Sequence, residues 1–140
     1  MIQKRVMIVE DSAMMRLIIS NMLKKDPNFR IINDAENGKR ALEALDNTKS
    51  PQPDLILLDL EMPEMDGIEF LSHARTKTNA KIIVLTSAAP AGSHKAAKAI
   101  ALGADAIVSK PSGAVSFDLE KARGTELFSI IYRLFGLDSP

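Results

Sequence analysis

The sequence contains no cysteine, which excludes disulfide bonds, thiolate catalysis and zinc sites built on thiolates. It also has no apolar run approaching the roughly 20 residues needed to cross a membrane. The sequence has 18 basic residues (lysine plus arginine) and 18 acidic residues (aspartate plus glutamate), so its formal net charge is zero. The composition therefore gives no support for a partner that is nucleic acid or a membrane surface. No signal peptide precedes the first strand-like run, and a cytoplasmic protein is therefore expected.

Short apolar runs alternate along the chain with stretches of helical periodicity. The segments predicted as strands are residues 6–9, 29–35, 55–58, 81–85 and 106–108. The periodic stretches, predicted as helices, are residues 12–25, 38–45, 67–75, 90–102 and about 125–135. Continuously apolar strands that alternate with helices indicate a parallel sheet covered on both faces. We therefore predict a flavodoxin-like, doubly wound (βα)5 fold of the α/β class, with strand order 2-1-3-4-5.

The 140 residues suit one domain, and the chain has no internal repeat, low-complexity segment or boundary to a second domain. Residues 1–111 are expected to form the core through the fifth strand. Residues 112–124 are expected to form a loop or linker-like segment, and residues 125–140 the last helix and tail of the same domain.

Polar side chains follow four of the predicted strands. Glu10 and Asp11 follow the first strand, Asp59 the third, Thr86 the fourth and Lys110 the fifth. Ligands of open parallel sheets bind at the carboxyl ends of the strands, and strands one and three are central neighbours in the predicted order. Three carboxylates therefore come together. At about 4 Å and an effective dielectric constant of about 20, two such charges repel by roughly 4 kcal/mol.

A hard divalent cation would offset this repulsion, and Mg²⁺ commonly takes one or two carboxylates and keeps several waters. Lys110 adds a compact ammonium charge and Thr86 a hydroxyl donor. Together these groups form a receptacle for a phosphoryl group. In such a site an aspartate is the nucleophile, while the metal and the lysine stabilise charge on the transferring oxygens.

The same residues stand in longer motifs that resemble the response-regulator receiver family of two-component signalling. The motifs keep the family's order across about residues 5 to 135, and they are Val9-Glu10-Asp11-Ser12, Asp54 to Gly67 (DLILLDLEMPEMDG), Thr86-Ser87, Gly103-Ala104-Asp105 and Lys110-Pro111. Each motif alone is unspecific, but together at these separations they are highly specific.

The resemblance implies that Asp59 accepts the phosphoryl group from a sensor histidine kinase. Thr86 would hydrogen-bond the phosphoryl group and move with it, and Lys110 would pair with its oxygens. A cis bond between Lys110 and Pro111 is also implied. Receivers usually carry an aromatic residue three positions before the lysine, where this chain has Ile107. In the family this aromatic side chain turns inward on activation. Because Ile107 stands at that position, the resemblance does not predict such a movement for this chain.

The resemblance also implies the metal ligands. Mg²⁺ would bind Asp11, Asp59 and the backbone carbonyl of Glu61, and Glu10 would reach it through water. Phosphorylation would change how the domain binds a downstream effector protein or a C-terminal output domain. No nucleic-acid or membrane partner is expected for this domain.

A narrower resemblance lies toward the C-terminus. Residues 103–113 (GADAIVSKPSG) and 116–119 (SFDL) are similar to the receiver-to-linker region of chemotaxis protein-glutamate methylesterases. In those proteins the receiver blocks a serine-hydrolase domain until it is phosphorylated. The chain has no room for that domain and contains no G-x-S-x-G elbow. It is therefore either a fragment or a stand-alone receiver, and is not expected to be an esterase by itself.

Other functions remain open on the residues alone. A pseudo-receiver would serve as a protein-interaction scaffold without phosphorylation. A haloacid-dehalogenase-type phosphatase would need a second aspartate where Glu61 stands. A nucleotide-binding flavodoxin-like protein would need a G-x-G-x-x-G motif after the first strand. His73 and His94 lie among polar residues of predicted helices and are expected at the surface without a catalytic role.

Overall fold

The computed structural model describes residues 3–62, 65–86, 94–110 and 117–137. Within them, strands and helices alternate as β1 (Lys4–Val9), α1 (Ala13–Lys24), β2 (Phe29–Ala35), α2 (Gly38–Asp46), β3 (Leu55–Asp59), α3 (Gly67–Ala74), β4 (Lys81–Thr86), α4 (His94–Ala101), β5 (Ala106–Ser109) and α5 (Phe117–Phe135). Every predicted strand and helix is present. Those ends that fall within the described residues lie within about two residues of the prediction, except at the start of α5.

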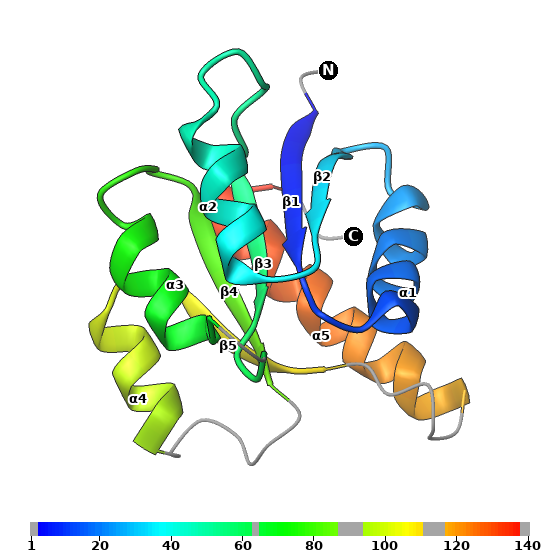
Figure 1. The fold of residues 1–140 in the computed structure, drawn as a ribbon. Coiled ribbons are helices and arrows are strands. Elements are labelled where there is room, and N and C mark those ends of the chain that lie inside the picture. The colour runs from blue at the N-terminus through cyan, green and yellow to red at the C-terminus, as the bar shows by residue number, and fades with distance from the viewer. Residues whose placement is uncertain (1–2, 63–64, 87–93, 111–116, 138–140) are drawn as a thin grey trace.

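The strands of the described residues form one parallel sheet in the order β2-β1-β3-β4-β5. This confirms the predicted flavodoxin-like fold. Val9 pairs with Leu58, and Asp59 with Leu85, so β1, β3 and β4 end at the same edge of the sheet. Figure 1 shows α2, α3 and α4 on one face of the sheet and α1 and α5 on the other. The chain reverses its winding between β1 and β3, which makes their carboxyl ends the switch point of the fold.

Alternate residues of the strands pack into two apolar cores, one on each face of the sheet. The core under α2, α3 and α4 includes Met7, Val9, Ile56, Leu58, Ile82, Val84 and Phe70. The core under α1 and α5 includes Val6, Ile8, Leu55, Leu57, Ile83, Ile19, Leu23, Leu127 and Ile131. Fully burying one large apolar side chain contributes roughly 1.5–3 kcal/mol. The central strands are therefore held rigidly on both faces.

Helix α1 begins directly after the acidic pair that ends β1. Ser12 is its N-cap, and the Ser12 hydroxyl accepts the Met15 backbone N–H at 3.2 Å. Ile19 and Leu23 form the buried face of the helix. Met14, by contrast, is 70% exposed. One residue along an α-helix is a rotation of about 100°, which turns Met14 away from the face that includes Met15.

The last helix is longer than predicted. Its start was expected at Thr125, but α5 extends from Phe117 to Phe135. Gly124 suggested the end of a linker, yet a glycine inside a helix costs only about 1 kcal/mol relative to alanine. The preceding residues 119–123 (LEKAR) are all good helix formers. The predicted start of α4 at Pro90 and the predicted cis bond before Pro111 fall outside the described residues.

Helix α5 is anchored to the opposite end of the sheet from the switch point. The Tyr132 hydroxyl donates a hydrogen bond to the Asp26 carboxylate and accepts one from the Asn28 amide at 2.9 Å. The Tyr132 ring also meets Phe29 edge-on, with 6.0 Å between the ring centroids. These contacts tie the last helix to the turn before β2. Among the described helices, none is long and apolar enough to span a membrane.

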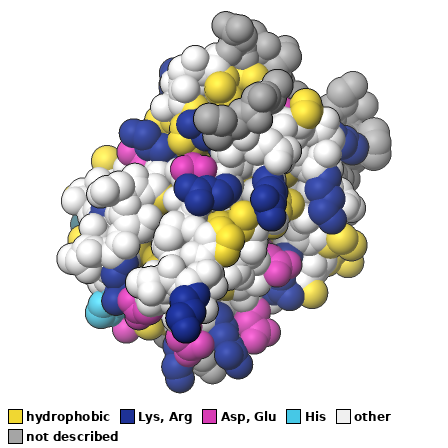
Figure 2. Space-filling model, turned by 90° about the horizontal axis from the view of Figure 1, so that it is seen from above, with side chains coloured by type: hydrophobic (Ala, Val, Ile, Leu, Met, Phe, Trp, Pro, Cys, Tyr) yellow, Lys and Arg dark blue, Asp and Glu magenta, His cyan; other side chains and the backbone are white. Residues whose placement is uncertain are grey.

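Figure 2 shows the end of the molecule at which β1 begins. Lysine and arginine side chains are interspersed there with acidic ones. A shallow depression of about 540 Å³ lies at this end, lined by residues 52–54 and 75–81 and by Phe135. Basic charges mixed with acidic ones do not make the single-sign surface that favours phosphate backbones. The acidic residues predicted as the site lie at the other end of the strands.

Candidate functional site

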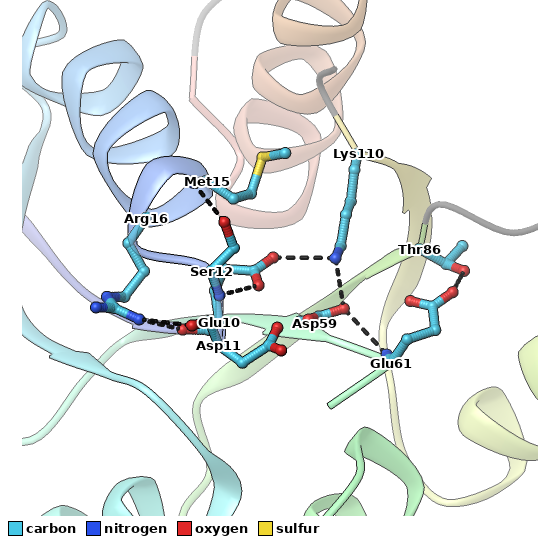
Figure 3. Close-up of polar contacts among 9 residues, drawn as sticks. All are labelled: Glu10, Asp11, Ser12, Met15, Arg16, Asp59, Glu61, Thr86 and Lys110. Atoms are coloured by element: carbon cyan, nitrogen blue, oxygen red, sulfur yellow. Dashed lines mark hydrogen bonds and ion pairs between the residues drawn. The ribbon is translucent and has the colours of Figure 1, made fainter. Parts of the chain in front are cut away.

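Three carboxylates meet at the carboxyl ends of β1 and β3. Glu10 and Asp11 follow β1, and Asp59 is the last residue of β3. One oxygen from each lies within 4.8 Å of the others. Figure 3 shows the three side chains on neighbouring strand ends. Glu10 is 1% exposed and Asp59 is 0% exposed, whereas Asp11 is exposed to solvent. The parallel pairing of β1 with β3 brings together residues that are almost fifty positions apart, as predicted from their places after the strands.

Lys110 completes the charge balance from the end of β5. Its ammonium lies 2.8 Å from Asp59 Oδ1 and 3.1 Å from Glu10 Oε1, and its side chain is 14% exposed. Its backbone N–H donates to the Thr86 carbonyl at 3.0 Å, which continues the pairing of β5 with β4. A buried cation between two buried carboxylates offsets the repulsion that would otherwise open the site.

The pKa values of the site reflect burial and these close charges. Burial raises the pKa of Asp59 to about 8; Glu10 acts in the same direction, and Lys110 opposes both. Burial acts to lower the pKa of Lys110, but its contacts with Asp59 and Glu10 outweigh burial and raise it. Burial acts to raise the pKa of Asp11, yet hydrogen bonds with Glu10 and Asp59 and the charge of Lys110 lower it. Without a further cation, the site therefore resists full ionisation of Asp59 near neutral pH.

The loop after β3 is folded tightly against the Asp59 backbone. The Glu61 N–H donates to Asp59 Oδ1 at 3.0 Å, and the Leu60 N–H donates to the Leu85 carbonyl at 2.9 Å. Gly67 closes the loop: a Cβ there would lie 2.8 Å from the Asp59 carbonyl oxygen and 2.8 Å from Leu60 Cα. Only glycine allows this approach without displacing backbone. The orientation of the Asp59 carboxylate therefore depends on the shape of this loop.

Thr86 ends β4 and is 2% exposed. Its hydroxyl donates a hydrogen bond to the Glu61 carboxylate, and Figure 3 shows the two side chains facing each other beside Asp59. The sequence predicted a role for the Glu61 backbone carbonyl only, so this side-chain contact was missed. The glutamate two residues after the acceptor position was its only signal in the sequence.

Arg16 is a second residue that sequence reasoning missed. One turn into α1, its guanidinium donates to the Glu10 carbonyl at 2.8 Å and to the Asp11 carbonyl at 3.3 Å. The Ser12 N–H donates to the Glu10 carboxylate at 2.9 Å. These hydrogen bonds hold the loop that carries both acids. A basic residue one helical turn after an acidic pair was the available signal.

The donor set fits a hard divalent cation. Asp59 Oδ2 is buried and, among the described residues, receives no hydrogen bond. Asp11 is exposed beside it, so water can complete the coordination shell of an ion bound there. Carboxylate oxygens with access to water suit Mg²⁺, which keeps several waters when bound to proteins. The site contains neither histidine nor cysteine, and both His73 and His94 are exposed, as expected.

The residues from β1 into α5 match a family model as a unit. The model, described as the response regulator receiver domain, matches residues 6–123. The chain belongs to the response regulator receiver family. Receiver domains generally bind Mg²⁺ at an acidic pocket, and this receiver has an acidic cluster of Glu10, Asp11 and Asp59.

The relatives place this receiver in chemotaxis signalling. It is 42% identical over 119 residues to the protein-glutamate methylesterase/protein-glutamine glutaminase of Halalkalibacterium halodurans, a match that covers 85% of the receiver and 34% of the relative. The response regulator domain of Thermotoga maritima CheB superposes with a TM-score of 0.83 at 29% identity, covering 97% of this chain and 98% of that chain. The receiver spans about a third of the length of the curated relatives it matches.

A further solved structure concerns a kinase complex. A chain from the complex of the P1 domain of CheA3 with CheY6 from R. sphaeroides is 49% identical and has a TM-score of 0.72, with 93% of this receiver and 99% of that chain covered. The receiver is therefore homologous both to the regulatory region of methylesterases and to chemotaxis response regulators. Receivers of this type interact with histidine kinases and with output domains.

Proposed function

We propose that this receiver is a phosphoryl-accepting switch in which Asp59 is the acceptor. The observation that carries the proposal is the buried Asp59 carboxylate, which lies 2.8 Å from the Lys110 ammonium and beside two further acids. An Asp59 oxygen attacks the phosphorus of a phosphohistidine. The new P–O bond forms as the P–N bond breaks, and the imidazole nitrogen keeps the electron pair.

Each neighbouring residue would have a distinct role in that step. Lys110 would move from the Asp59 carboxylate to the phosphoryl oxygens, and the Thr86 hydroxyl would turn toward them. Mg²⁺ would be held by Asp11, Asp59 and the Glu61 carbonyl, with Glu10 acting through water. When bound, the ion supplies positive charge for the oxygens of the transferring group.

The test is phosphoryl uptake measured by intact mass. The protein is incubated with Mg²⁺ and acetyl phosphate as wild type, as Asp59→Asn and as Asp54→Asn. Asp54 is a matched control, because it is a partly buried aspartate at the opposite end of β3, bonded to Arg5. We expect a gain of one phosphoryl group in wild type and in Asp54→Asn, and none in Asp59→Asn. A folded wild-type protein that gains no mass would favour the scaffold function instead.

We further propose that a histidine-phosphotransfer domain of a kinase docks on α1. Met14 is 70% exposed and Leu17 is 59% exposed, and both lie within two turns of Asp11. An exposed apolar pair beside the acceptor suits a transient protein contact. The complex of a kinase P1 domain with a chemotaxis response regulator supports this choice of partner.

The double variant Met14→Asp, Leu17→Asp is expected to slow transfer from a phosphorylated kinase domain about tenfold or more, because two apolar contacts become charged. Uptake from acetyl phosphate should not change. Ile100→Asp, at an exposed apolar residue of α4, is the matched control and should leave both rates unchanged. The docking proposal fails if the α1 variant slows both donors equally, and quench-flow transfer assays give the two rates.

The output is proposed from the relatives. The curated relatives compared above include methylesterases, so we propose that Asp59 phosphorylation relieves or alters binding to a methylesterase domain, in the same polypeptide or in a separate one. A downstream effector of another kind is the alternative. Binding of an isolated methylesterase domain to the receiver, with and without phosphorylation, distinguishes the two, and equal binding in both states would reject the methylesterase as the output.

A further inference from the structure

The Glu61 carboxylate accepts the hydroxyl proton of Thr86, the residue expected to bind the phosphoryl group. We propose that Glu61 is a positioning residue that holds Thr86 in the unphosphorylated position and competes with the phosphoryl group for the Thr86 hydroxyl. The inference rests on the proposed acceptor function of Asp59. It adds a determinant of how readily the site takes up a phosphoryl group.

Glu61 contacts both parts of the switch at once. Its backbone N–H donates to Asp59 Oδ1 at 3.0 Å, and its side chain accepts from Thr86. Thr86 is 2% exposed, and its main chain is paired with Ser109 and accepts the Lys110 N–H. The ladder thus holds the Thr86 backbone, whereas rotation of its side chain would redirect the hydroxyl. Figure 3 shows the Glu61–Thr86 contact on the side of Asp59 away from Glu10 and Asp11.

The Glu61 carboxylate and a phosphoryl oxygen on Asp59 would compete for the hydroxyl proton of Thr86. A hydroxyl carries one proton, so it can donate either to the Glu61 carboxylate or to a phosphoryl oxygen. Hydrogen bonds to ionised acceptors are roughly twice as strong as neutral ones, so the Glu61 contact is a substantial competitor. A phosphoryl group on Asp59 would also add about −1.5 to −2 of charge close to a carboxylate, and like charges repel. Phosphorylation therefore has to displace the Glu61–Thr86 contact.

As a consequence, only a fraction of the unphosphorylated molecules would have the Thr86 hydroxyl available for a phosphoryl group. A ligand shifts a two-state equilibrium only by its differential affinity, and affinity is reduced by the fraction of molecules that are not binding-competent. Removing the Glu61 acceptor should raise that competent fraction. Glu61→Met removes the acceptor with little change in volume, and Glu61→Gln keeps a neutral acceptor, so the second variant should give a smaller effect.

The experiment measures binding of beryllofluoride with Mg²⁺, a non-covalent phosphoryl analogue, by titration calorimetry. We expect Glu61→Met to bind it about tenfold more tightly than wild type, corresponding to one charge-assisted hydrogen bond. Glu36→Met removes an exposed carboxylate after β2 at the same edge of the sheet and should change binding less than about twofold. Glu61→Gln should lie between wild type and Glu61→Met.

A double-mutant cycle with Thr86→Val separates hydrogen bonding from charge repulsion. If Glu61 acts through the Thr86 hydroxyl, Glu61→Met should tighten binding less than about twofold in the Thr86→Val background. An equal tightening in both backgrounds would mean that Glu61 only repels the anion, and the proposal would be wrong. The proposal would also be wrong if Glu61→Met did not bind the analogue more tightly than wild type when Thr86 is kept.

The Thr86 rotamer in the ligand-free protein tests the contact independently of phosphorylation. Side-chain scalar couplings should report one dominant rotamer in wild type and rotamer averaging in Glu61→Met. If neither protein binds the analogue, the acceptor function itself fails, and the couplings still decide this proposal. Identical Thr86 couplings in the two proteins would reject Glu61 as the residue that positions the hydroxyl.

Discussion

Lys110→Met is expected to lower the free energy of unfolding by about 3–5 kcal/mol at pH 8 in the absence of divalent metal. Methionine keeps the length and flexibility of the side chain but removes its charge. The Lys110 ammonium lies 2.8 Å from Asp59 and 3.1 Å from Glu10, both of which are buried. Its loss leaves the buried Glu10 and Asp59 carboxyl groups without a described cationic partner, at a pH where Asp59 is partly ionised, which is why the expected effect is large.

Two changes of condition should reduce this loss. Lowering the pH to about 6 should diminish it, because burial already raises the pKa of Asp59 to about 8 and the carboxyl is then protonated. Millimolar Mg²⁺ should also diminish it, because an ion bound to the acidic pocket replaces the missing charge. Urea unfolding at the two pH values, with and without Mg²⁺, measures all four conditions.

Lys77→Met is the matched control. The Lys77 ammonium also lies 2.7 Å from a carboxylate, that of Asp46, but 58% of the Asp46 side chain is exposed. Exposed ion pairs contribute roughly 0–1 kcal/mol, so this variant should lose little stability and show no response to Mg²⁺. Equal losses in the two variants would contradict the view that burial makes the Lys110 pair decisive.

Asp59→Asn is expected to change the free energy of unfolding in the opposite direction from Lys110→Met, so that it stabilises the metal-free protein. Asparagine keeps the shape of the side chain and removes a charge that is 0% exposed and faces Glu10. Lys110 keeps Glu10 as a partner at 3.1 Å, so no described cation is left unpaired. We expect the free energy of unfolding to rise by at least about 2 kcal/mol at pH 8, and the melting temperature by about 6 °C.

The pH dependence follows from the direction of the Asp59 pKa shift. In the unfolded chain the carboxyl loses its proton near pH 4, whereas burial keeps it protonated up to about pH 8 in the folded state. Between these values the folded state binds more protons, so wild-type stability falls as the pH rises. The advantage of Asp59→Asn should therefore be small near pH 4, grow through the neutral range and level off above pH 8.

Asp54→Asn is the control, because it should lower the free energy of unfolding whereas Asp59→Asn should raise it. Burial acts to raise the pKa of Asp54, but hydrogen bonds and charge from Arg5 lower it overall. Its ionised form is therefore favoured by folding, and the variant should lose roughly 1 kcal/mol above pH 5. Thermal melts of the three proteins at pH 5 and pH 8 measure both effects. An Asp59→Asn variant less stable than wild type at pH 8 would show that its charge is compensated in the metal-free protein.

Together the two variants describe a site that is strained electrostatically until a cation arrives. The acceptor carboxylate reduces stability, and Lys110 compensates only in part. Functional sites commonly retain such unfavourable groups, because the same charges bind the ligand. In this receiver the unfavourable charge lies where the proposed Mg²⁺ and phosphoryl group would bind.

The strands, the helices and the place of the site were determined by the sequence alone. Apolar runs predicted four of the strands, and Phe29–Ala35, which mixes apolar and polar residues, was predicted as the fifth. The polar residues after the strands predicted that Glu10, Asp11, Asp59 and Lys110 would converge. This worked because strand burial depends on local periodicity, and because parallel strands end at a common edge. The motif spacing also identified the receiver family, which the family match confirms.

The side-chain partners were decided only by the tertiary structure. The Thr86 hydroxyl meets the Glu61 carboxylate, and Arg16 meets the carbonyls of Glu10 and Asp11, because loops from different strands fold over one edge of the sheet. Such contacts depend on loop paths that periodicity does not encode. The early start of α5 at Phe117 was missed for a local reason, because neighbouring helix formers outweigh the weak signal of one glycine.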